Sequence, residues 1–451
     1  MHQLLCRKTI LTALLFMIVA ILGGNTYADK KQFPKIKLTP FTNVATINAV
    51  TGPGGINHEE SDKLAKDLAT VIATYVARTD TEEVLGTDSN WVLGGLEGEP
   101  TDDAIAEAIL HIPTPFVINP DLPMSTTNRK KVNIIEMCNK VFAQKALGIL
   151  PVVDGRDDTK IVNGTIHAPA LPCETAVYFD GTKIQIDTLN PVAIFTLFFT
   201  DVLFGEQMQD PEFAQEIQEL PVKVNDEIMT IIYAALDGDE ITFTEKHKPL
   251  GPKYQWLDEV VEEVANTPFD SPFVHFTYTK LDTTTPIDST YVKHIAETII
   301  DTASTDGSHD LALDEKLNET DWRSARPGPL PIPGNQVVEM CSPTNAIKAM
   351  STGMHHATAL PCEVSVAAIE DGSKLLISYL DPHFMFNALF KDAFNQMSEE
   401  ELDEFAALPP LVLEDLQTIV GYALDNLGEL SEPKQVCYNM LPTADGYCQD
   451  D

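Results

Sequence analysis

One stretch of sequence occurs twice in the chain, and this repeat constrains the fold more than any other feature. Four segments of the first copy, at 134–138, 167–174, 180–191 and 230–237, align with 337–341, 356–363, 371–382 and 418–425 of the second. The clearest pair is HAPALPCE at 167–174 and HATALPCE at 356–363. The repeat unit, about 200 residues long, is far longer than a solenoid repeat. It therefore predicts two homologous domains, packed as a pseudo-two-fold pair.

Each copy is expected to be an α+β layered domain. Apolar residues at helical spacing predict one amphipathic helix per copy, over Leu64, Leu68, Val71, Ile72, Tyr75 and Val76 and over Val292, Ile295, Ala296 and Ile299. Asp180-Gly181 and Asp371-Gly372 lie between β-rich runs and predict hairpins. Pro191 and Pro382 suit the first turn of a helix. The predicted order is β-α-β-α-β-β-α-α in each copy.

The N-terminus has the layout of a secretory signal. Arg7 and Lys8 precede an apolar run over 10–22, and the small-residue pattern Thr26-Tyr27-Ala28 follows it. We expect a cleavable signal peptide over 1–28, a first repeat domain over 29–247 and a second over 248–451. The protein is then secreted or periplasmic, and an uncleaved anchor is the alternative. No membrane span is expected in the mature chain, because the apolar run 192–204 is too short and contains Asp201.

The charge balance excludes some partners. The chain has 68 acidic and 30 basic residues and a formal net charge of -38. Such a chain repels phosphate groups, so we expect neither nucleic acid nor an anionic lipid surface as a partner. The acidity serves mainly solubility, and binding of cations or of a basic partner is the alternative.

Six cysteines remain after the expected cleavage, and in an oxidising compartment they could pair in 15 ways. Cys138 and Cys173 occupy the repeat positions of Cys341 and Cys362. If both copies share one fold, the disulfide bonds are Cys138–Cys173 and Cys341–Cys362. Cys437 and Cys448 are then left to close a loop in the C-terminal tail. Thiols that bind a ligand or take part in redox chemistry are the alternative.

At these residues the chain resembles the domain-of-unknown-function family 302. In the second copy Cys341-Ser342-Pro343 is close to the family's Cys-Asn-Pro, and Leu360-Pro361-Cys362 and Asp381-Pro382 match its Leu-Pro-Cys and Asp-Pro. The first copy departs from the pattern at Cys138-Asn139-Lys140 and Asn190-Pro191. The resemblance implies a compact α+β domain that also occurs in tandem. The family has no settled biochemical activity, so the resemblance supplies no mechanism.

Common catalytic motifs are missing from the sequence. It contains no phosphate-binding loop, no Cys-x-x-Cys, no G-x-S-x-G and no His-Glu-x-x-His. The segment around Asp306-Gly307 lacks the oxygen ligands of an EF-hand, and Leu313 stands where the closing glutamate belongs. These absences favour a protein without catalytic activity.

Two groups of residues could still bind a ligand or carry chemistry. His355, His356, His383 and Met354 offer imidazole and thioether ligands for copper or zinc. The second group is a candidate pocket of acids and a repeated histidine, made of Glu136, His167, Glu174, Glu339 and Glu363. Paired carboxylates perform acid–base work when one of them is desolvated, whereas most such glutamates are solvated or paired with a cation.

The sequence thus favours an exported two-domain binding or assembly protein without a cofactor, whose partner is an unknown protein or small molecule and which can self-associate. The alternative is an extracytoplasmic metal-handling protein or enzyme that uses the residues around His356. Convergence of the histidines and glutamates in one pocket would favour the alternative.

Overall fold

The computed structural model describes residues 39–436, except 87–88, 97, 119–120, 122–127, 148–164, 200–201, 203–209, 253–271, 283, 333, 361 and 395. The expected signal peptide, the Cys437 and Cys448 positions and Asp201 lie outside the described residues.

The described chain contains two seven-stranded sheets, each packed against helices. The first sheet contains β1 (Phe41–Asn48), β4 (Trp91–Leu93), β5 (Leu110–Val117), β6 (Arg129–Asn139), β7 (Cys173–Phe179), β8 (Lys183–Leu189) and β9 (Phe243–Leu250). The second contains β10 (Phe273–Thr279), β11 (Arg323–Ser324), β12 (Leu330–Ile332), β13 (Asn335–Cys341), β14 (Cys362–Ile369), β15 (Lys374–Leu380) and β16 (Lys434–Val436). We call residues 39–250 the first half and residues 272–436 the second half.

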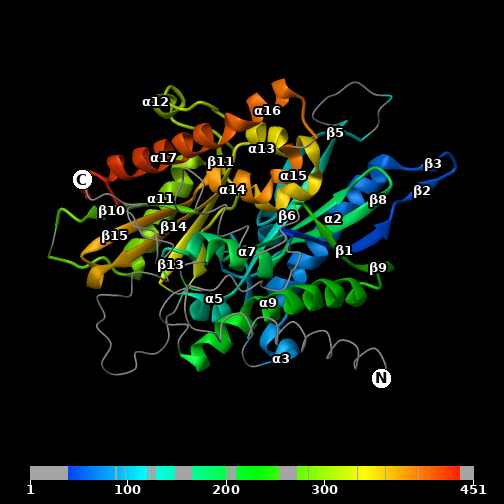
Figure 1. Ribbon diagram of the computed structural model, residues 1–451, viewed down its shortest axis with the longest axis horizontal. Coiled ribbons are helices and arrows are strands. Elements are labelled where there is room, and N and C mark those ends of the chain that lie inside the picture. Colours follow the sequence, from blue (N-terminus) through cyan, green and yellow to red (C-terminus); the bar gives the residue numbers. More distant parts are fainter. Residues whose placement is uncertain are drawn as a thin grey trace, which may run out of the picture.

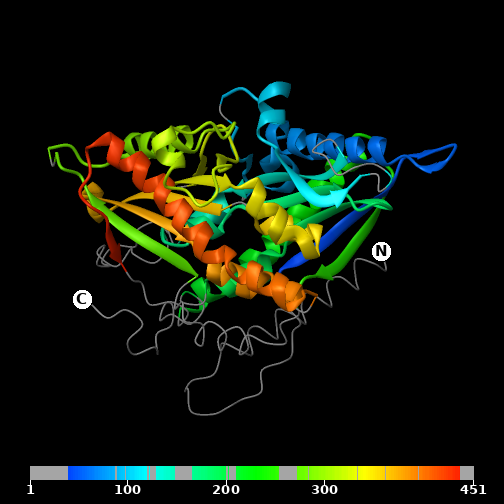
Figure 2. The same cartoon turned by 90° about the horizontal axis from the view of Figure 1, so that it is seen from above.

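The two sheets have the same strand order. The first runs β4-β6-β7-β8-β1-β9 with β5 beside β6, and the second runs β11-β13-β14-β15-β10-β16 with β12 beside β13. Neighbouring strands are antiparallel. In Figures 1 and 2 the blue-to-green first half and the yellow-green-to-red second half lie side by side. The expected α+β architecture is confirmed in this coarse form.

Two long helices cover one face of each sheet. Helices α2 (His58–Arg78) and α9 (Pro211–Gly238) share a core with the first sheet, and α11 (Ser289–Ala303) and α17 (Leu408–Leu427) share one with the second. In Figure 2, α2 (blue) and α11 (yellow-green) lie along the same side of the molecule. The four second-half residues predicted to form a helical face are all buried on α11. On α2, Leu68, Ile72 and Val76 are buried.

The opposite faces of the sheets meet through short helices. These are α5 (Lys140–Ala146), η3 (Ala168–Ala170) and α7 (Pro191–Phe198) in the first half, and α13 (Pro343–Ala349), η5 (Met350–Thr352), η6 (Met354–Ala359), α14 (Pro382–Leu389), α15 (Lys391–Phe394) and α16 (Glu399–Ala406) in the second. Side chains from both halves form one apolar cluster there. The rings of Phe198 and Phe384 meet across it, with centroids 5.2 Å apart. The two halves therefore share a core as well as a chain.

Local sequence explains where the short helices begin. Asn190 and Asp381 accept hydrogen bonds from the backbone N–H groups of Val192 and His383, and Pro191 and Pro382 occupy the first turns as predicted. Both predicted hairpins also form, between β7 and β8 and between β14 and β15.

The remaining described elements lie at the periphery. They are the β2–β3 hairpin (Thr51–Gly52 and Gly55–Ile56), α3 (Thr81–Leu85), α4 (Asp102–Glu107), α12 (Leu311–Asp314) and η7 (Glu370–Gly372). The predicted element order omitted β5, the short strands β4, β11 and β12, and the edge strands β9 and β16. Strand β9 also extends the first sheet past the expected domain boundary at residue 247, as far as Leu250. Among the described residues no helix has both the length and the apolar character of a membrane span.

The shared core yields a prediction about cooperativity. Phe384 is 3% exposed and contacts the first half through Phe198, so Phe384→Ala should lower the free energy of unfolding by about 3–5 kcal/mol. Because the contact joins the halves, scanning calorimetry should show one transition in the wild type and a split or broadened one in the variant. The exposed Leu402→Ala serves as control and should change stability by less than about 0.5 kcal/mol. A variant that still melts in one transition as sharp as that of the wild type would contradict the prediction.

Candidate functional site

Four buried glutamates converge between the two sheets. In the strand ladders Glu136 on β6 lies opposite Glu174 on β7, and Glu339 on β13 lies opposite Glu363 on β14. All four are at most 5% exposed. Carboxylate oxygens of Glu174, Glu339 and Glu363 lie within 4.8 Å of one another, so acids from both halves occupy one small space. We call these four residues the glutamate cluster.

Strand alternation places the glutamate cluster at the interface. Side chains point alternately to the two faces of a strand. On β6, Ile135 and Met137 enter the core under the long helices, whereas Ile134 enters the core shared with the other half. Glu136 therefore lies on the interface side. In the same way Val338 and Met340 on β13 pack under α11 and α17, which places Glu339 on the side facing the first half.

One arginine enters the glutamate cluster. The Arg326 Nε atom lies 3.6 Å from Glu136 Oε2, and its Nη2 atom lies 3.3 Å from Glu339 Oε2. The guanidinium also donates to the carbonyl oxygens of Ile134 and Ala325, at 3.4 and 3.2 Å. Arg326 is 2% exposed. It thus contacts a glutamate of each half. The sequence analysis missed it, although its distance from Trp322 equals that of Gly95 from Trp91.

Two glycines make room for these side chains. A Cβ atom at Gly94 would lie 1.8 Å from Glu136 Oε2, and one at Gly95 would lie 2.6 Å from Arg326 Cβ. The Gly94 N–H donates to the Glu136 carbonyl, as the Ala325 N–H does to that of Glu339. Gly94 and Gly95 therefore stand at the positions of Ala325 and Arg326 in the other half. A side chain at residue 95 would collide with Arg326, so the space beside Gly95 has no room for a second arginine.

The pKa values of these carboxyl groups are displaced upward. Burial raises the pKa of Glu136, Glu174 and Glu363 well above the ordinary glutamate value, since a carboxylate loses its hydration there. The neighbouring carboxylates add to the shift: Glu339 acts on Glu136 and Glu363, and Glu363 acts on Glu174. Arg326 partly offsets the rise in the pKa of Glu136. The cluster therefore retains protons that exposed glutamates release.

A second group of converging side chains lies in the second half. The Nε2 atoms of His355 and His356 lie 3.6 and 3.3 Å from the two carboxylate oxygens of Asp392. One donor atom from each residue lies within 4.8 Å of the others. Side chains of His355 and Asp392 are 17% and 23% exposed, whereas His356 is fully buried. We call this group the histidine–aspartate cluster.

The surroundings of this cluster favour neutral imidazole and ionised carboxylate. Burial lowers the pKa of His356 to about 4. Burial alone would raise the pKa of Asp392, but the contacts with the imidazoles of His355 and His356 hold it below its usual value. The Thr352 hydroxyl lies 3.4 Å from His356 Nδ1, the nitrogen that faces away from Asp392. Such an outer contact fixes the ring of a metal-binding histidine.

Some predicted ligands lie apart from this cluster. The His383 Nδ1 atom contacts Asp381 Oδ1 at 3.0 Å, beside the N-cap of α14. Met354 is 7% exposed and belongs to the shared apolar core. His167 is also packed at the interface: its ring stacks on Phe199 at 4.5 Å and meets the edge of Phe273 at 5.5 Å. Asp392, which completes the donor set, was not among the ligands predicted from the sequence.

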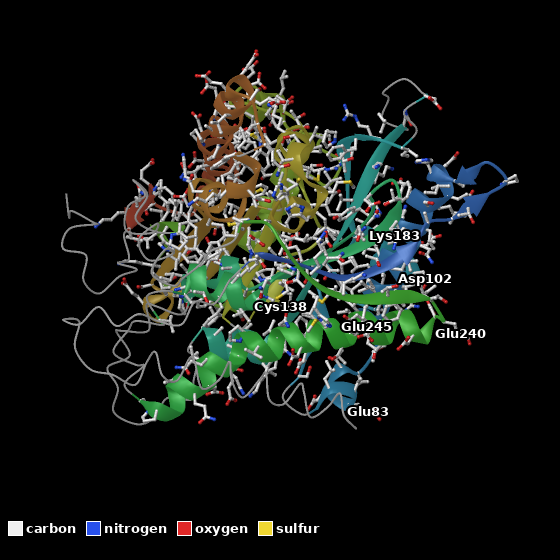
Figure 3. The ribbon with its side chains drawn as sticks, turned by 45° about the vertical axis from the view of Figure 1, so that its right-hand side comes forward. Glu83, Asp102, Cys138, Lys183, Glu240 and Glu245 are labelled. Atoms are coloured by element: carbon white, nitrogen blue, oxygen red, sulfur yellow. The ribbon has the colours of Figure 1, made fainter. Side chains whose placement is uncertain are left out.

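Each half contains an apolar pocket with equivalent walls. The first encloses about 580 Å³ and the second about 510 Å³, the open mouths included. Shared positions in the two walls are Trp91 and Trp322, Cys138 and Cys341, Leu171 and Leu360, Cys173 and Cys362, Pro191 and Pro382, and Phe195 and Phe386. Cys138 is buried and lies toward the middle of the view in Figure 3, whereas the exposed Glu83 and Glu240 lie near its lower and right-hand edges.

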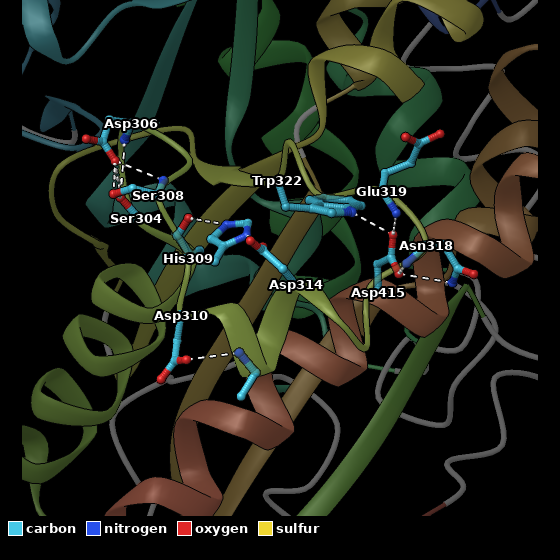
Figure 4. Close-up of polar contacts among 12 residues, drawn as sticks. Ser304, Asp306, Ser308, His309, Asp310, Asp314, Asn318, Glu319, Trp322 and Asp415 are labelled. Carbon is cyan, nitrogen blue, oxygen red and sulfur yellow. Dashed lines mark hydrogen bonds and ion pairs between the residues drawn. The ribbon is translucent and has the colours of Figure 1, made fainter.

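An acidic side chain on α9 or α17 accepts a hydrogen bond from each tryptophan, and of the two acids Asp415 is buried and Glu227 half-buried. The Trp322 indole donates to Asp415 Oδ2 at 2.8 Å, and Asp415 also accepts backbone N–H groups from Asn318 and Glu319 (Figure 4). The Trp91 indole donates to Glu227 Oε2 at 2.7 Å. Asp306 caps a turn with Ser304 and Ser308 (Figure 4), in keeping with the absence of an EF-hand.

The predicted disulfide bonds within the two halves are absent. Cys138, Cys173, Cys341 and Cys362 are free thiols. The strand register gives the reason: Cys173 lies opposite Met137 and Cys362 opposite Met340, one residue away from the partner cysteines. Alternation therefore directs the two thiols of each half to opposite faces of the sheet. Burial raises the pKa of all four thiols, that of Cys341 to about 12, so they are protonated and unreactive.

The raised pKa values make the stability of the fold depend on pH. In the folded protein a carboxyl group with a raised pKa keeps a proton that the unfolded chain releases above about pH 4.5. The stability that this bound proton contributes to the folded state is therefore lost as the pH rises through the folded-state pKa. Glu174→Gln should remove this loss, and the variant should gain stability relative to the wild type by up to about 1.4 kcal/mol per pH unit. Urea unfolding in EDTA between pH 5 and 9 measures the difference. The exposed Glu83→Gln should give a curve parallel to that of the wild type, and a parallel curve for Glu174→Gln would refute the expectation.

Gly95 and Gly98 allow a matched test of the packing around Arg326. Both have positive φ, +70° and +75°, so alanine should strain the backbone by about 1–2 kcal/mol at either position. At Gly98 a Cβ atom meets nothing within 4 Å, whereas at Gly95 it collides with Arg326. Gly95→Ala should therefore cost about 1–3 kcal/mol more than Gly98→Ala in urea unfolding. Equal losses would show that Arg326 is free to move aside.

The family model of the domain of unknown function DUF302 matches residues 325–407. The match begins beside Arg326 and includes Glu339, Glu363 and the histidine–aspartate cluster. It covers one domain in the second half, so a second copy of this family domain in residues 29–247 stays a prediction. No curated protein and no solved structure matches the chain significantly.

Proposed function

We propose that the chain is an exported binding protein without catalytic activity, whose ligand is a divalent transition-metal ion, foremost zinc. The histidine–aspartate cluster would hold the ion. The N-terminal sequence over residues 1–28 supports export through its basic, apolar and small-residue regions.

Within this proposal the two halves are homologous domains that imitate a homodimer in one chain. Their equal strand orders support the proposal, and so do reciprocal contacts at the interface. His356 of the second half meets the edge of Phe41 on β1 at 5.7 Å, and His167 of the first half meets Phe273 on β10 at 5.5 Å. The two equivalent pockets are further support.

The convergence of His355, His356 and Asp392 carries the metal assignment. Two imidazole nitrogens and one carboxylate oxygen are donors that zinc accepts, and three protein ligands leave one coordination position open. The low pKa of His356 keeps its imidazole neutral at physiological pH, as a ligand must be. Copper(II) accepts the same donors and binds such sites more tightly, so both ions belong in the test. Copper(I) fits less well, because it prefers a thioether ligand and Met354 is buried in the apolar core.

Titration calorimetry and native mass spectrometry of the exported protein test the proposal. We expect one equivalent of zinc or copper(II) to bind with a dissociation constant of about micromolar or below. The double variant His355→Ala/His356→Ala and the single variant Asp392→Asn should each weaken binding by about a hundredfold or more. His383→Ala is the control and should bind as the wild type does. The intact mass also reports whether residues 1–28 have been removed.

Binding of zinc and copper(II) weaker than millimolar would end the metal assignment. Equal binding by the wild type and the double variant would likewise end it, because the ion would then lie elsewhere.

A further inference from the structure

The space inside the glutamate cluster is lined by oxygen atoms without partners. The Oε1 atoms of Glu136, Glu174 and Glu339 accept no hydrogen bond within the described part of the chain, whereas Glu339 Oε2 lies 3.3 Å from Arg326 Nη2. These side chains are at least 98% buried. A buried polar atom without a partner typically costs about 1–3 kcal/mol, and a charged one costs more. The orphan oxygens thus mark the place of a missing positive group.

We propose that Glu174, Glu339 and Glu363 bind one hard divalent cation, Ca²⁺ by preference, which joins the two halves. One of the ligands belongs to the first half and two belong to the second. This site is separate from the histidine–aspartate cluster, and the inference stands independently of the proposed function.

The distances suit a single ion. Calcium lies 2.3–2.6 Å from its oxygen ligands, so two ligands of one ion are at most about 5 Å apart. The three carboxylate oxygens lie within 4.8 Å of one another. One ion can therefore touch all three without a movement of the strands.

The charges also favour a cation. Arg326 lies beside Glu136 and Glu339 and balances one negative charge of the four. Three ionised carboxylates would remain without a counter-charge in a buried space. A divalent cation removes most of this excess, and one retained proton removes the rest. The glycine at residue 95, which excludes a second arginine, preserves that excess of negative charge.

The donor type selects the class of ion. The three residues offer carboxylate oxygen alone, which suits Ca²⁺, Mg²⁺ and Mn²⁺ rather than zinc or copper. Mg²⁺ gives up its water reluctantly and prefers wetter sites. The depth of the cluster therefore favours Ca²⁺, and Mn²⁺ is a suitable spectroscopic substitute.

Binding is measured on the exported chain that carries His355→Ala/His356→Ala, so that the histidine–aspartate cluster takes no ion. Loss of the free Mn²⁺ signal in electron paramagnetic resonance, and its recovery on addition of Ca²⁺, count the sites. We expect about one site per chain. Glu174→Gln and Glu363→Gln should each reduce affinity at least tenfold, whereas Asp415→Asn, which alters a buried carboxylate outside the cluster, should leave it unchanged.

A second measurement does not depend on any glutamate variant. Calorimetry of Ca²⁺ binding in buffers of different ionisation enthalpy should show protons released on binding, because the cation displaces the protons held by the cluster. No binding of Ca²⁺ or Mn²⁺ up to millimolar concentration overturns the inference, and the cluster then holds its protons alone. Equal binding by the parent and both glutamine variants overturns it too. Zinc binding to the wild type is unaffected by either failure, so the two proposals fail separately.

Discussion

The burial of four carboxyl groups beside one arginine is the constraint on which the interface depends. Each sheet presents two glutamates from adjacent strands, and all four are at most 5% exposed. Isolated buried carboxylates are too costly to persist, so the halves must meet with compensating groups in register. Arg326 and the retained protons provide that compensation, and Gly94 and Gly95 leave room for the Glu136 and Arg326 side chains. The apolar contacts around the cluster, such as Phe198 with Phe384, then supply the affinity between the halves.

The two clusters differ in what burial does to them. In the glutamate cluster all donors are acids, so burial raises their pKa values and favours protons or a hard cation. In the histidine–aspartate cluster burial lowers the pKa of His356, and the partly exposed Asp392 keeps its charge. The same physical effect thus raises carboxyl pKa values in one cluster and keeps an imidazole neutral in the other, as the two proposed metal sites require.

The hairpins and helix starts that occur in both copies of the repeat were predicted from the sequence. Residues that act through contacts with the other half, such as Arg326, were missed. The hairpins at residues 180–181 and 371–372 and the helix starts at Pro191 and Pro382 follow from local turn and cap chemistry. The sequence did not decide whether the glutamates converge. The alternation of side chains along a strand predicts which face of the sheet a residue lies on, but not what packs against that face. Arg326 had no local signal, since its partners are close only after the halves meet. The prediction of a disulfide bond within each half was wrong, because equivalent positions establish that two cysteines are alike, not that their side chains leave a sheet on the same face.

Gly95 and Arg326 show what a single chain gains over a dimer of identical subunits. Near a two-fold axis, two identical chains place the same residue on both sides. An arginine at this position would therefore lie opposite the same arginine of the other chain. A glycine there would leave the centre without a cation. Covalent linkage removes that obligation. A single chain can place Arg326 opposite Gly95. In the same way it has His355 in one half at the position where the other half has Ile166. Under the proposal that the halves are homologous domains, asymmetry at the centre is therefore available only to the fused pair.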